Sequence, residues 1–244
     1  MDKLWKYVIM ASALVLSAMV LAAAYTSGSR NLGTITVTGL GETEFSSDMI
    51  VINGVVNVKS GDAAEGYTSL EAQRKHVSEF LLKRGVKEEE ITFAMPSAHE
   101  DYENYYDDNG RYRSRFAGYV LRQAFTIESR GVDSTELAAR ELPSLMAEGV
   151  MVSVDEPMYY YTQLESVKHD LIGAAAADAR RRAEIIATNS GAMLGVLSQS
   201  RAGVFQITAA TGDEEFSAGG SLNLSSRDKK ARVTVRAEYK IRNN

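Results

Sequence analysis

Residues Leu164–Asn189 read LESVKHDLIGAAAADARRRAEIIATN and predict the longest helix of the chain. Apolar residues recur at helical spacing along one face of this segment: Val167, Leu171, Ala174, Ala175, Ala183 and Ile186. A helix with one apolar face must bury that face against another element, so we expect it to pack on a sheet.

Extended segments lie on both sides of this helix. Before it, Ile35–Glu42 alternates in polarity and breaks at glycines, and Met49–Val58 is rich in β-branched residues. Three strands are expected after it: Leu194–Ser198, Val204–Thr208 and Ala231–Ile241. The Gly-, Ser- and charge-rich stretch Gly212–Lys230 is expected to form a surface loop between the last two strands.

A shorter helix is predicted in the first half of the chain. Leu70, Val77 and Leu81 form an apolar stripe at helical spacing. Asp62 stands where an N-cap is needed, and Gly85 is a natural terminator.

A third helix is expected over Thr135–Glu148, with Asp133 near its start at capping spacing. Pro143 should kink or shorten this helix, and Pro157 should interrupt a strand expected over Met151–Tyr161. Strand pairs therefore alternate with helices, which predicts an α+β fold with a mixed or mainly antiparallel sheet and helices packed on one face.

The N-terminus has the composition of an export segment. Tyr7–Ser29 contains no charged residue, and Lys3 and Lys6 precede it. The residues expected to span the membrane include Val8, Leu14, Leu16, Val20 and Leu21. Residues 1–30 are expected to form a signal anchor and residues 31–244 the exported domain. Ala22 and Ala24 also offer an A-x-A cleavage site, so a cleaved, soluble periplasmic form stays open as the alternative.

Composition excludes several classes of protein. The 244 residues are 45% hydrophobic and 24% charged, which is globular rather than disordered or polytopic. The net charge of −5, without a basic block, argues against nucleic-acid binding, because that affinity comes largely from phosphate neutralisation. The chain has no cysteine, so it has no disulfide framework, thiol nucleophile or cysteine-based zinc site.

The segment His99–Arg115, HEDYENYYDDNGRYRSR, predicts a hairpin with Asn109-Gly110 at its centre. In that register Tyr106 would face Arg113. Three interpretations remain open: an exposed twisted hairpin, a protein-contact arm built from Tyr102, Tyr105, Tyr106 and Arg113, or an acidic Ca²⁺ site.

No catalytic constellation is evident elsewhere. The three histidines, His76, His99 and His169, lack metal-site spacing, and the chain contains neither a G-x-S-x-G elbow nor a P-loop. We therefore expect no enzyme activity, no metal and no cofactor. On the long helix, Asp178, Arg180 and Arg181 belong either to a solvated charged face or to a subunit contact.

Short motifs that span residues 34–241 resemble, in their order and spacing, the SIMPL-domain family of exported bacterial proteins. They are ITVTGLGE at 35–42, GVKEEEIT at 85–92, Gly118-Tyr119, ADARRRA at 177–183, Ser190-Gly191, Leu194-Gly195 and VTVRAEY at 233–239. The N-terminal segment together with Gln206-Ile207 is most similar to the membrane-anchored branch. The Tyr-rich hairpin and the Gly212–Lys230 loop depart from the common pattern of the family.

The resemblance implies an exported, envelope-facing α/β protein. With the N-terminal segment as an anchor, we expect the protein in the bacterial inner membrane, with its C-terminal domain in the periplasm or outside. The resemblance also implies a homo-oligomer, and a role in envelope integrity or oxidative-stress tolerance, with no catalytic residues to carry over. Other envelope proteins are alternative partners. The alternative function is a small-ligand or cation-binding periplasmic module that uses the acidic hairpin.

Overall fold

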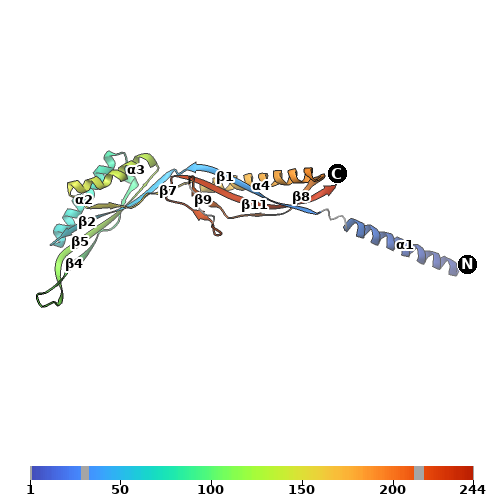
Figure 1. The fold of residues 1–244 in the computed structure, drawn as a ribbon, viewed down its shortest axis with the longest axis horizontal. Coiled ribbons are helices and arrows are strands. Elements are labelled where there is room, and N and C mark those ends of the chain that lie inside the picture. Colours follow the sequence, from blue (N-terminus) through green and yellow to red (C-terminus); the bar gives the residue numbers. More distant parts are fainter. Residues whose placement is uncertain (1, 29–32, 212–216, 244) are drawn as a thin grey trace. The chain divides into compact units, whose positions relative to one another are not determined.

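The computed structural model describes residues 2–28, 33–211 and 217–243 (Figure 1). The helices are α1 (Asp2–Gly28), α2 (Ala63–Lys83), α3 (Val132–Glu141) and α4 (Leu164–Asn189), with 3₁₀ helices at Glu88–Glu90 and Leu142–Glu148. The strands are β1 (Thr34–Ser46), β2 (Met49–Ser60), β3 (Ile91–Phe93), β4 (Ser97–Tyr106), β5 (Tyr112–Ser129), β6 (Val152–Val154), β7 (Met158–Tyr160), β8 (Ala192–Ala202), β9 (Gln206–Ala209), β10 (Ser221–Leu222) and β11 (Asp228–Asn243). The predicted α+β class is confirmed, and the parallel pairing of β9 with β10 makes one sheet mixed.

The chain divides into two compact units, and β1, α4 and β11 contribute residues to both. Unit 1 consists of Met1–Gly41, Ile172–Gly203 and Val233–Asn244, and unit 2 consists of Glu42–Leu171 and Val204–Arg232.

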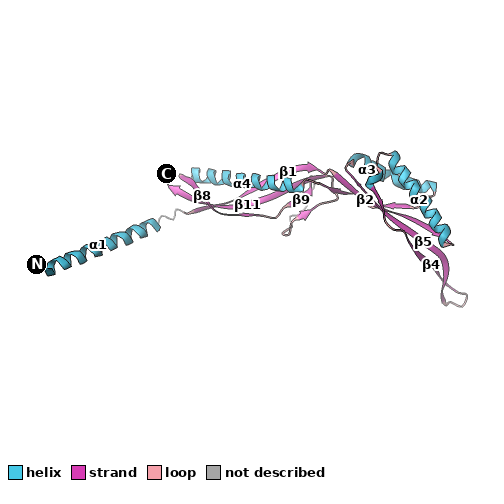
Figure 2. Ribbon diagram, turned by 180° about the vertical axis from the view of Figure 1, so that it is seen from behind, coloured by secondary structure: helices cyan, strands magenta, loops and turns pink. Residues whose placement is uncertain are grey.

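Unit 2 is built on an antiparallel sheet in the order β3-β5-β2-β6, with β4 also paired to β5 and β7 to β2. Helices α2 and α3 cover one face of this sheet (Figures 1 and 2). The predicted stripe is confirmed, because Leu70, Val77 and Leu81 of α2 are completely buried against the sheet core. Asp62 is the N-cap of α2, where its side chain accepts hydrogen bonds from the backbone N–H groups of residues 64 and 65.

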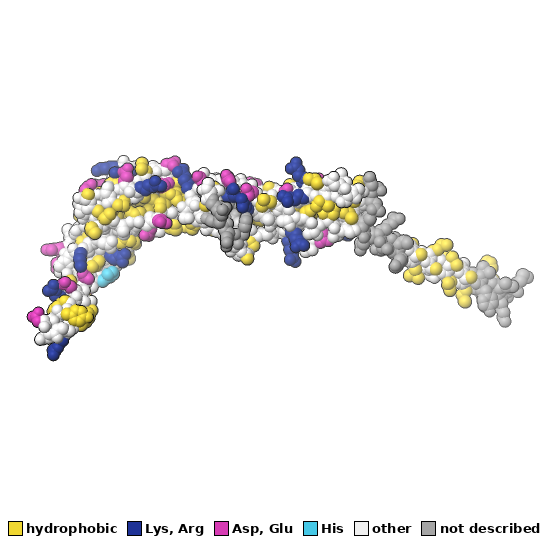
Figure 3. Space-filling model, viewed as in Figure 1, with side chains coloured by type: hydrophobic (Ala, Val, Ile, Leu, Met, Phe, Trp, Pro, Cys, Tyr) yellow, Lys and Arg dark blue, Asp and Glu magenta, His cyan; other side chains and the backbone are white. Residues whose placement is uncertain are grey.

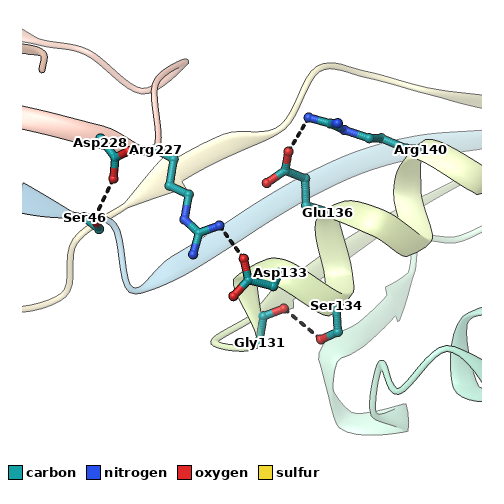
Figure 4. A network of polar contacts seen from close by, with 8 residues as sticks. All are labelled: Ser46, Gly131, Asp133, Ser134, Glu136, Arg140, Arg227 and Asp228. Atoms are coloured by element: carbon teal, nitrogen blue, oxygen red, sulfur yellow. Dashed lines mark hydrogen bonds and ion pairs between the residues drawn. The ribbon is translucent and has the colours of Figure 1, made fainter. Parts of the chain in front are cut away.

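Helix α3 begins earlier than the sequence pattern indicates. Its N-cap is Gly131, so Asp133 lies inside the first turn, and the prediction that its side chain caps the helix is wrong. The Asp133 carboxylate instead forms an ion pair with Arg227, next to the Arg140–Glu136 pair on the same helix (Figure 4). The shortening by Pro143 is confirmed, because the α-helix ends at residue 141 and a 3₁₀ helix takes over.

Unit 1 contains the sheet order β1-β11-β8, with α4 packed on one face of it. The bounds of α4 match the predicted helix. Its buried residues form a narrow stripe with a spacing of four: Leu171, Ala175, Ala179, Ala183 and Ala187.

The predicted apolar face of α4 is wrong at two positions, because Ala174 and Ile186 are exposed. A wider face cannot be buried, since the helix backbone lies directly on the strand at Gly39. A Cβ atom on Gly39 would lie 2.2 Å from the carbonyl oxygen of Ala175 and 2.3 Å from the amide nitrogen of Ala179. Only a line of small side chains fits beneath a helix at that distance.

A hydrogen bond connects α4 to the edge of β1. One carboxylate oxygen of Asp178 accepts a hydrogen bond of 2.9 Å from the backbone N–H of Leu40. The same oxygen accepts one of 2.8 Å from Nε of Arg182. The Leu40 N–H, followed by the charge of Arg182, lowers the pKa of Asp178 below its usual range.

Helix α1 exposes the apolar residues Leu14, Leu16, Val20 and Leu21, which were predicted to span a membrane. Val8 lies in α1, but its side chain is outside the part that the structure describes. Within the described residues, none of the helices has an apolar stretch of the length needed to cross a membrane.

We expect Gly39→Ala to destabilise the protein by about 2–3 kcal/mol, because the new methyl group collides with backbone atoms that cannot move aside. Urea unfolding followed by circular dichroism measures this loss. The control is Gly173→Ala in α4, where a Cβ meets nothing within 4 Å and helix propensity should add about 0.5–1 kcal/mol. If Gly39→Ala were as stable as the wild type, α4 could not lie as close to β1 at Gly39 as the structure has it.

We expect Asp178→Ala to cost about 1–2 kcal/mol at pH 7, because the Leu40 N–H and Arg182 lose their acceptor. The folded-state pKa of Asp178 lies below the unfolded value of about 4. The contribution of its carboxylate to the free energy of unfolding is therefore fully present above pH ~4. That contribution disappears as the pH falls through the lower folded-state value. The stability difference between variant and wild type should therefore shrink as the pH falls below ~4.

Asp170→Ala is the matched control for Asp178→Ala. Asp170 lies on the same helix, is exposed and has no ion pair among the described residues. Its replacement should change the free energy of unfolding by less than about 0.5 kcal/mol. A difference for Asp178→Ala that stays constant from pH 7 to pH 2 would show that its carboxylate charge is not involved.

Candidate functional site

The Tyr-rich hairpin forms in unit 2 from β4 and β5, but its register differs from the prediction. Tyr106 pairs with Tyr112, and Tyr105 pairs with Arg113. The predicted pairing of Tyr106 with Arg113 is wrong by one residue, because the loop has three residues between Asp107 and Arg111 instead of two. Gly110 supplies the left-handed conformation (φ +71°) that a three-residue loop requires.

Asp107 closes this loop. Its carboxylate accepts hydrogen bonds from the backbone N–H groups of Arg111 (2.9 Å) and Asn109 (3.0 Å), and it forms an ion pair of 3.1 Å with Arg113. The backbone N–H of Arg111 is the main cause that lowers the pKa of Asp107. The sequence signal for this role was an Asp placed two residues before Asn-Gly.

Two further carboxylates of the hairpin, those of Asp101 and Glu103, also contact basic side chains. Asp101 lies 2.5 Å from Nζ of Lys59, and Glu103 lies 2.6 Å from a guanidinium nitrogen of Arg115. Among the residues that the structure describes, no group of three or more His, Asp or Glu side chains is arranged to hold a metal ion. The geometry therefore gives no support to the Ca²⁺ interpretation of the hairpin.

The aromatic side chains of the hairpin are exposed. Tyr102, Tyr105 and Tyr106 have 51%, 42% and 73% of their surface accessible, and Figure 3 shows apolar side chains at the hairpin tip beside charges of both signs. Tyr106 packs edge-to-face on Tyr112 with 5.7 Å between ring centroids, and Arg115 lies over the Tyr105 ring. The hairpin thus presents exposed aromatic side chains beside arginine, and both residue types are enriched in contact surfaces between proteins.

The charged cluster predicted on α4 is largely engaged within the chain. Asp178 contacts Leu40 and Arg182, as described above. Arg180 pairs with Glu184 at 2.9 Å, and this contact is the main cause that raises the pKa of Arg180. Arg181 is exposed and has no ion pair in the described part of the chain. The hairpin and this cluster belong to different units, and their role in a subunit contact stays a prediction.

Unit 1 contains an apolar groove that the sequence did not indicate. Its volume is about 150 Å³. It is lined by Ile172 and Ala176 of α4, Leu197, Ser200 and Ala202 of β8, and Val235, Ala237 and Tyr239 of β11. Because α4 lies over β1 and β11, Leu197 of β8 stays half exposed beside the helix.

Strand β8 is also an open sheet edge. Among the described residues it pairs only with β11, so the backbone groups along its other side have no strand partner. Its sequence, AMLGVLSQSRA, contains no Lys or Pro, the residues that commonly protect such edges. That absence was the signal in the sequence, but it has meaning only once β8 is known to be an edge strand.

Two of the solved structures that match this chain are distant likenesses. The designed protein Foldit4 is 10% identical, with a TM-score of 0.25, over 44% of this chain and 93% of that one. The regulatory subunit of aspartate kinase from Thermus thermophilus is 13% identical, with a TM-score of 0.19, over 82% of this chain and 87% of that one. TM-scores below 0.5 support no conclusion about this chain.

No curated protein matches the chain. A family model does match it, over residues 35–239, and its description is "SIMPL: Protein of unknown function (DUF541)". The match covers both units of the fold, including β8, α4 and the hairpin. The protein therefore belongs to the SIMPL family.

Proposed function

We propose that this protein acts without catalysis, by assembling with copies of itself at a membrane surface. The observation that carries the proposal is the open edge of β8 beside the apolar groove in unit 1. An unpaired strand edge next to exposed apolar side chains favours association with another chain. The exposed hairpin tyrosines offer a second contact surface on unit 2.

The N-terminal segment supports export and tethering as part of the same proposal. An uncharged stretch of 23 residues, 7–29, follows two lysines, which is typical of a segment that keeps its N-terminus in the cytoplasm. We propose that it remains attached as an anchor in the bacterial inner membrane, with the two units in the periplasm or outside. Family membership leaves the biological role open, and support of envelope integrity or oxidative-stress tolerance is the consequence we propose for such an assembly.

Light scattering of the exported protein in mild detergent tests the assembly. We expect a protein mass that is a multiple of 26.7 kDa. Leu197→Lys should shift the protein to smaller species, because it places a charge at the groove and on the open edge. The matched control is Met95→Lys, at a residue of unit 2 that is 92% exposed, and its mass should equal that of the wild type. A wild-type monomer would contradict the proposal.

The hairpin is tested by the same measurement. If its tyrosines form a subunit contact, the double variant Tyr105→Ala/Tyr106→Ala should also give smaller species, because two exposed aromatic anchors are removed. An unchanged mass would assign the assembly to unit 1 alone and remove the hairpin from the interface.

The anchor is tested by extraction of membranes with alkaline carbonate. We expect the wild type to stay in the membrane pellet, and Leu16→Arg to move largely to the supernatant, because a charge at the centre of the segment opposes insertion. Met95→Arg serves as the control and should stay in the pellet. Intact-mass measurement identifies the cleaved form: a chain that begins after Ala24 would contradict the anchor.

A further inference from the structure

A second hollow opens in unit 1, on the face of the sheet that α4 does not cover. Its volume is about 310 Å³. It is lined by Thr36 of β1, Gln199 and Arg201 of β8, and Arg236 and Glu238 of β11. Side chains alternate between the faces of a strand, and Ala237 and Tyr239 face α4. Arg236 and Glu238 therefore lie on the opposite face.

Two arginines stand side by side in this hollow. Arg201 and Arg236 are direct partners in the β8–β11 ladder. Both are exposed, and neither forms an ion pair with any residue that the structure describes. Like charges directly opposite each other on a sheet repel, so a bound anion between them would remove a destabilising contact.

The surrounding charges also favour an anion. Lys240 and Arg242 alternate with the α4-facing residues of β11 and so share the open face with the arginine pair. Glu238 is the acidic residue on this part of β11, which makes the face positive on a chain whose net charge is −5. An arginine fork matches the oxygens of a phosphate group in a bidentate way, more closely than a lysine does.

The remaining lining groups indicate hydroxyl groups on the same ligand. Glu238 is the ladder partner of Gln199. The carboxylate accepts hydrogen bonds only, while the amide of Gln199 and the hydroxyl of Thr36 can donate or accept them. A phosphate bound by the arginines would place attached hydroxyl groups within the same 310 Å³ hollow.

We propose that this hollow binds the phosphate ester of a polyol. Arg201 and Arg236 hold the phosphate, and Glu238 and Gln199 hold the hydroxyl groups. A soluble metabolite and a phosphoglycerol lipid headgroup share this chemistry. The site is on the face of the sheet opposite the apolar groove, and it goes beyond the proposed function because self-assembly requires no ligand.

The test is a calorimetric titration of the full chain in a neutral detergent. One arm adds glycerol 3-phosphate, with glycerol as the uncharged comparison, and the other adds phosphatidylglycerol in mixed micelles, with phosphatidylcholine as the comparison. We expect binding in at least one arm and none in its comparison. Arg201→Gln and Arg236→Gln should each weaken it about tenfold, and the double variant about a hundredfold.

The matched control is the double variant Arg111→Gln/Arg122→Gln. These two exposed arginines of unit 2 have no ion pair among the described residues, and their replacement changes the net charge equally. We expect its affinity to equal that of the wild type. Glu238→Gln should weaken binding of glycerol 3-phosphate relative to inorganic phosphate. The lost negative charge favours both anions, whereas the neutral amide is a weaker acceptor for the hydroxyl groups that only glycerol 3-phosphate carries.

Two outcomes would overturn the proposal: no binding in either arm, or binding that the Arg201/Arg236 and Arg111/Arg122 double variants reduce equally. Binding in the glycerol 3-phosphate arm supports a soluble ligand, and binding confined to phosphatidylglycerol supports a lipid headgroup. Light scattering of the same samples tests self-assembly independently of ligand binding. A high mass without binding contradicts only the ligand site, and binding to a monomer contradicts only the proposed assembly.

Discussion

The architecture of unit 1 depends on one close approach between backbone atoms. Helix α4 lies on β1 where Gly39 has no side chain, so near to it that a single added carbon would collide with Ala175 and Ala179. Because the helix and the strand are so close, only alanine side chains fit between them along most of α4. This explains why the buried residues of α4 are mainly alanines that recur every four positions. Asp178 adds a hydrogen bond at the same place, because its carboxylate accepts the backbone N–H of Leu40 at the edge of the strand.

That approach has a consequence at the other edge of the same sheet, on the face that α4 covers. A helix that lies over β1 and β11 leaves much of β8 without cover, and Ile172 and Leu197 border the resulting groove. The edge of β1 is partly occupied by Asp178, whereas no described strand pairs with the outer edge of β8. In the part of this five-stranded sheet that lies in unit 1, the two edges are therefore unequal, which favours association through β8.

The same sheet has two chemically different faces. The α4 side combines an apolar groove with small buried side chains, and the opposite side combines two adjacent arginines with polar neighbours. In unit 2 the charges of the hairpin are arranged differently, because Asp101, Glu103 and Asp107 each contact a basic partner. Two arginines without an ion pair among the described residues are ladder partners in unit 1, and exposed tyrosines lie on the hairpin of unit 2.

Local interactions made much of the fold predictable from the sequence. The helix at 164–189, the N-cap Asp62 and the shortening at Pro143 all follow from the preferences of neighbouring residues, and the structure confirms them. The start of α3 was missed because its N-cap, Gly131, has no side chain that a capping pattern could reveal. The hairpin register was missed because a glycine with positive φ, here Gly110, fits loops of two or of three residues.

The candidate surfaces were decided by contacts between distant parts of the chain. Arg201 and Arg236 are 35 positions apart, and only the β8–β11 register makes them neighbours. Which alanines of α4 are buried depends on Gly39, more than 130 residues earlier. The sequence by itself determined the elements and the family, because these depend on local preference and short motifs. Only the tertiary structure decided which edge is open and which charges meet, because pairing between strands is a long-range choice that local propensity does not contain.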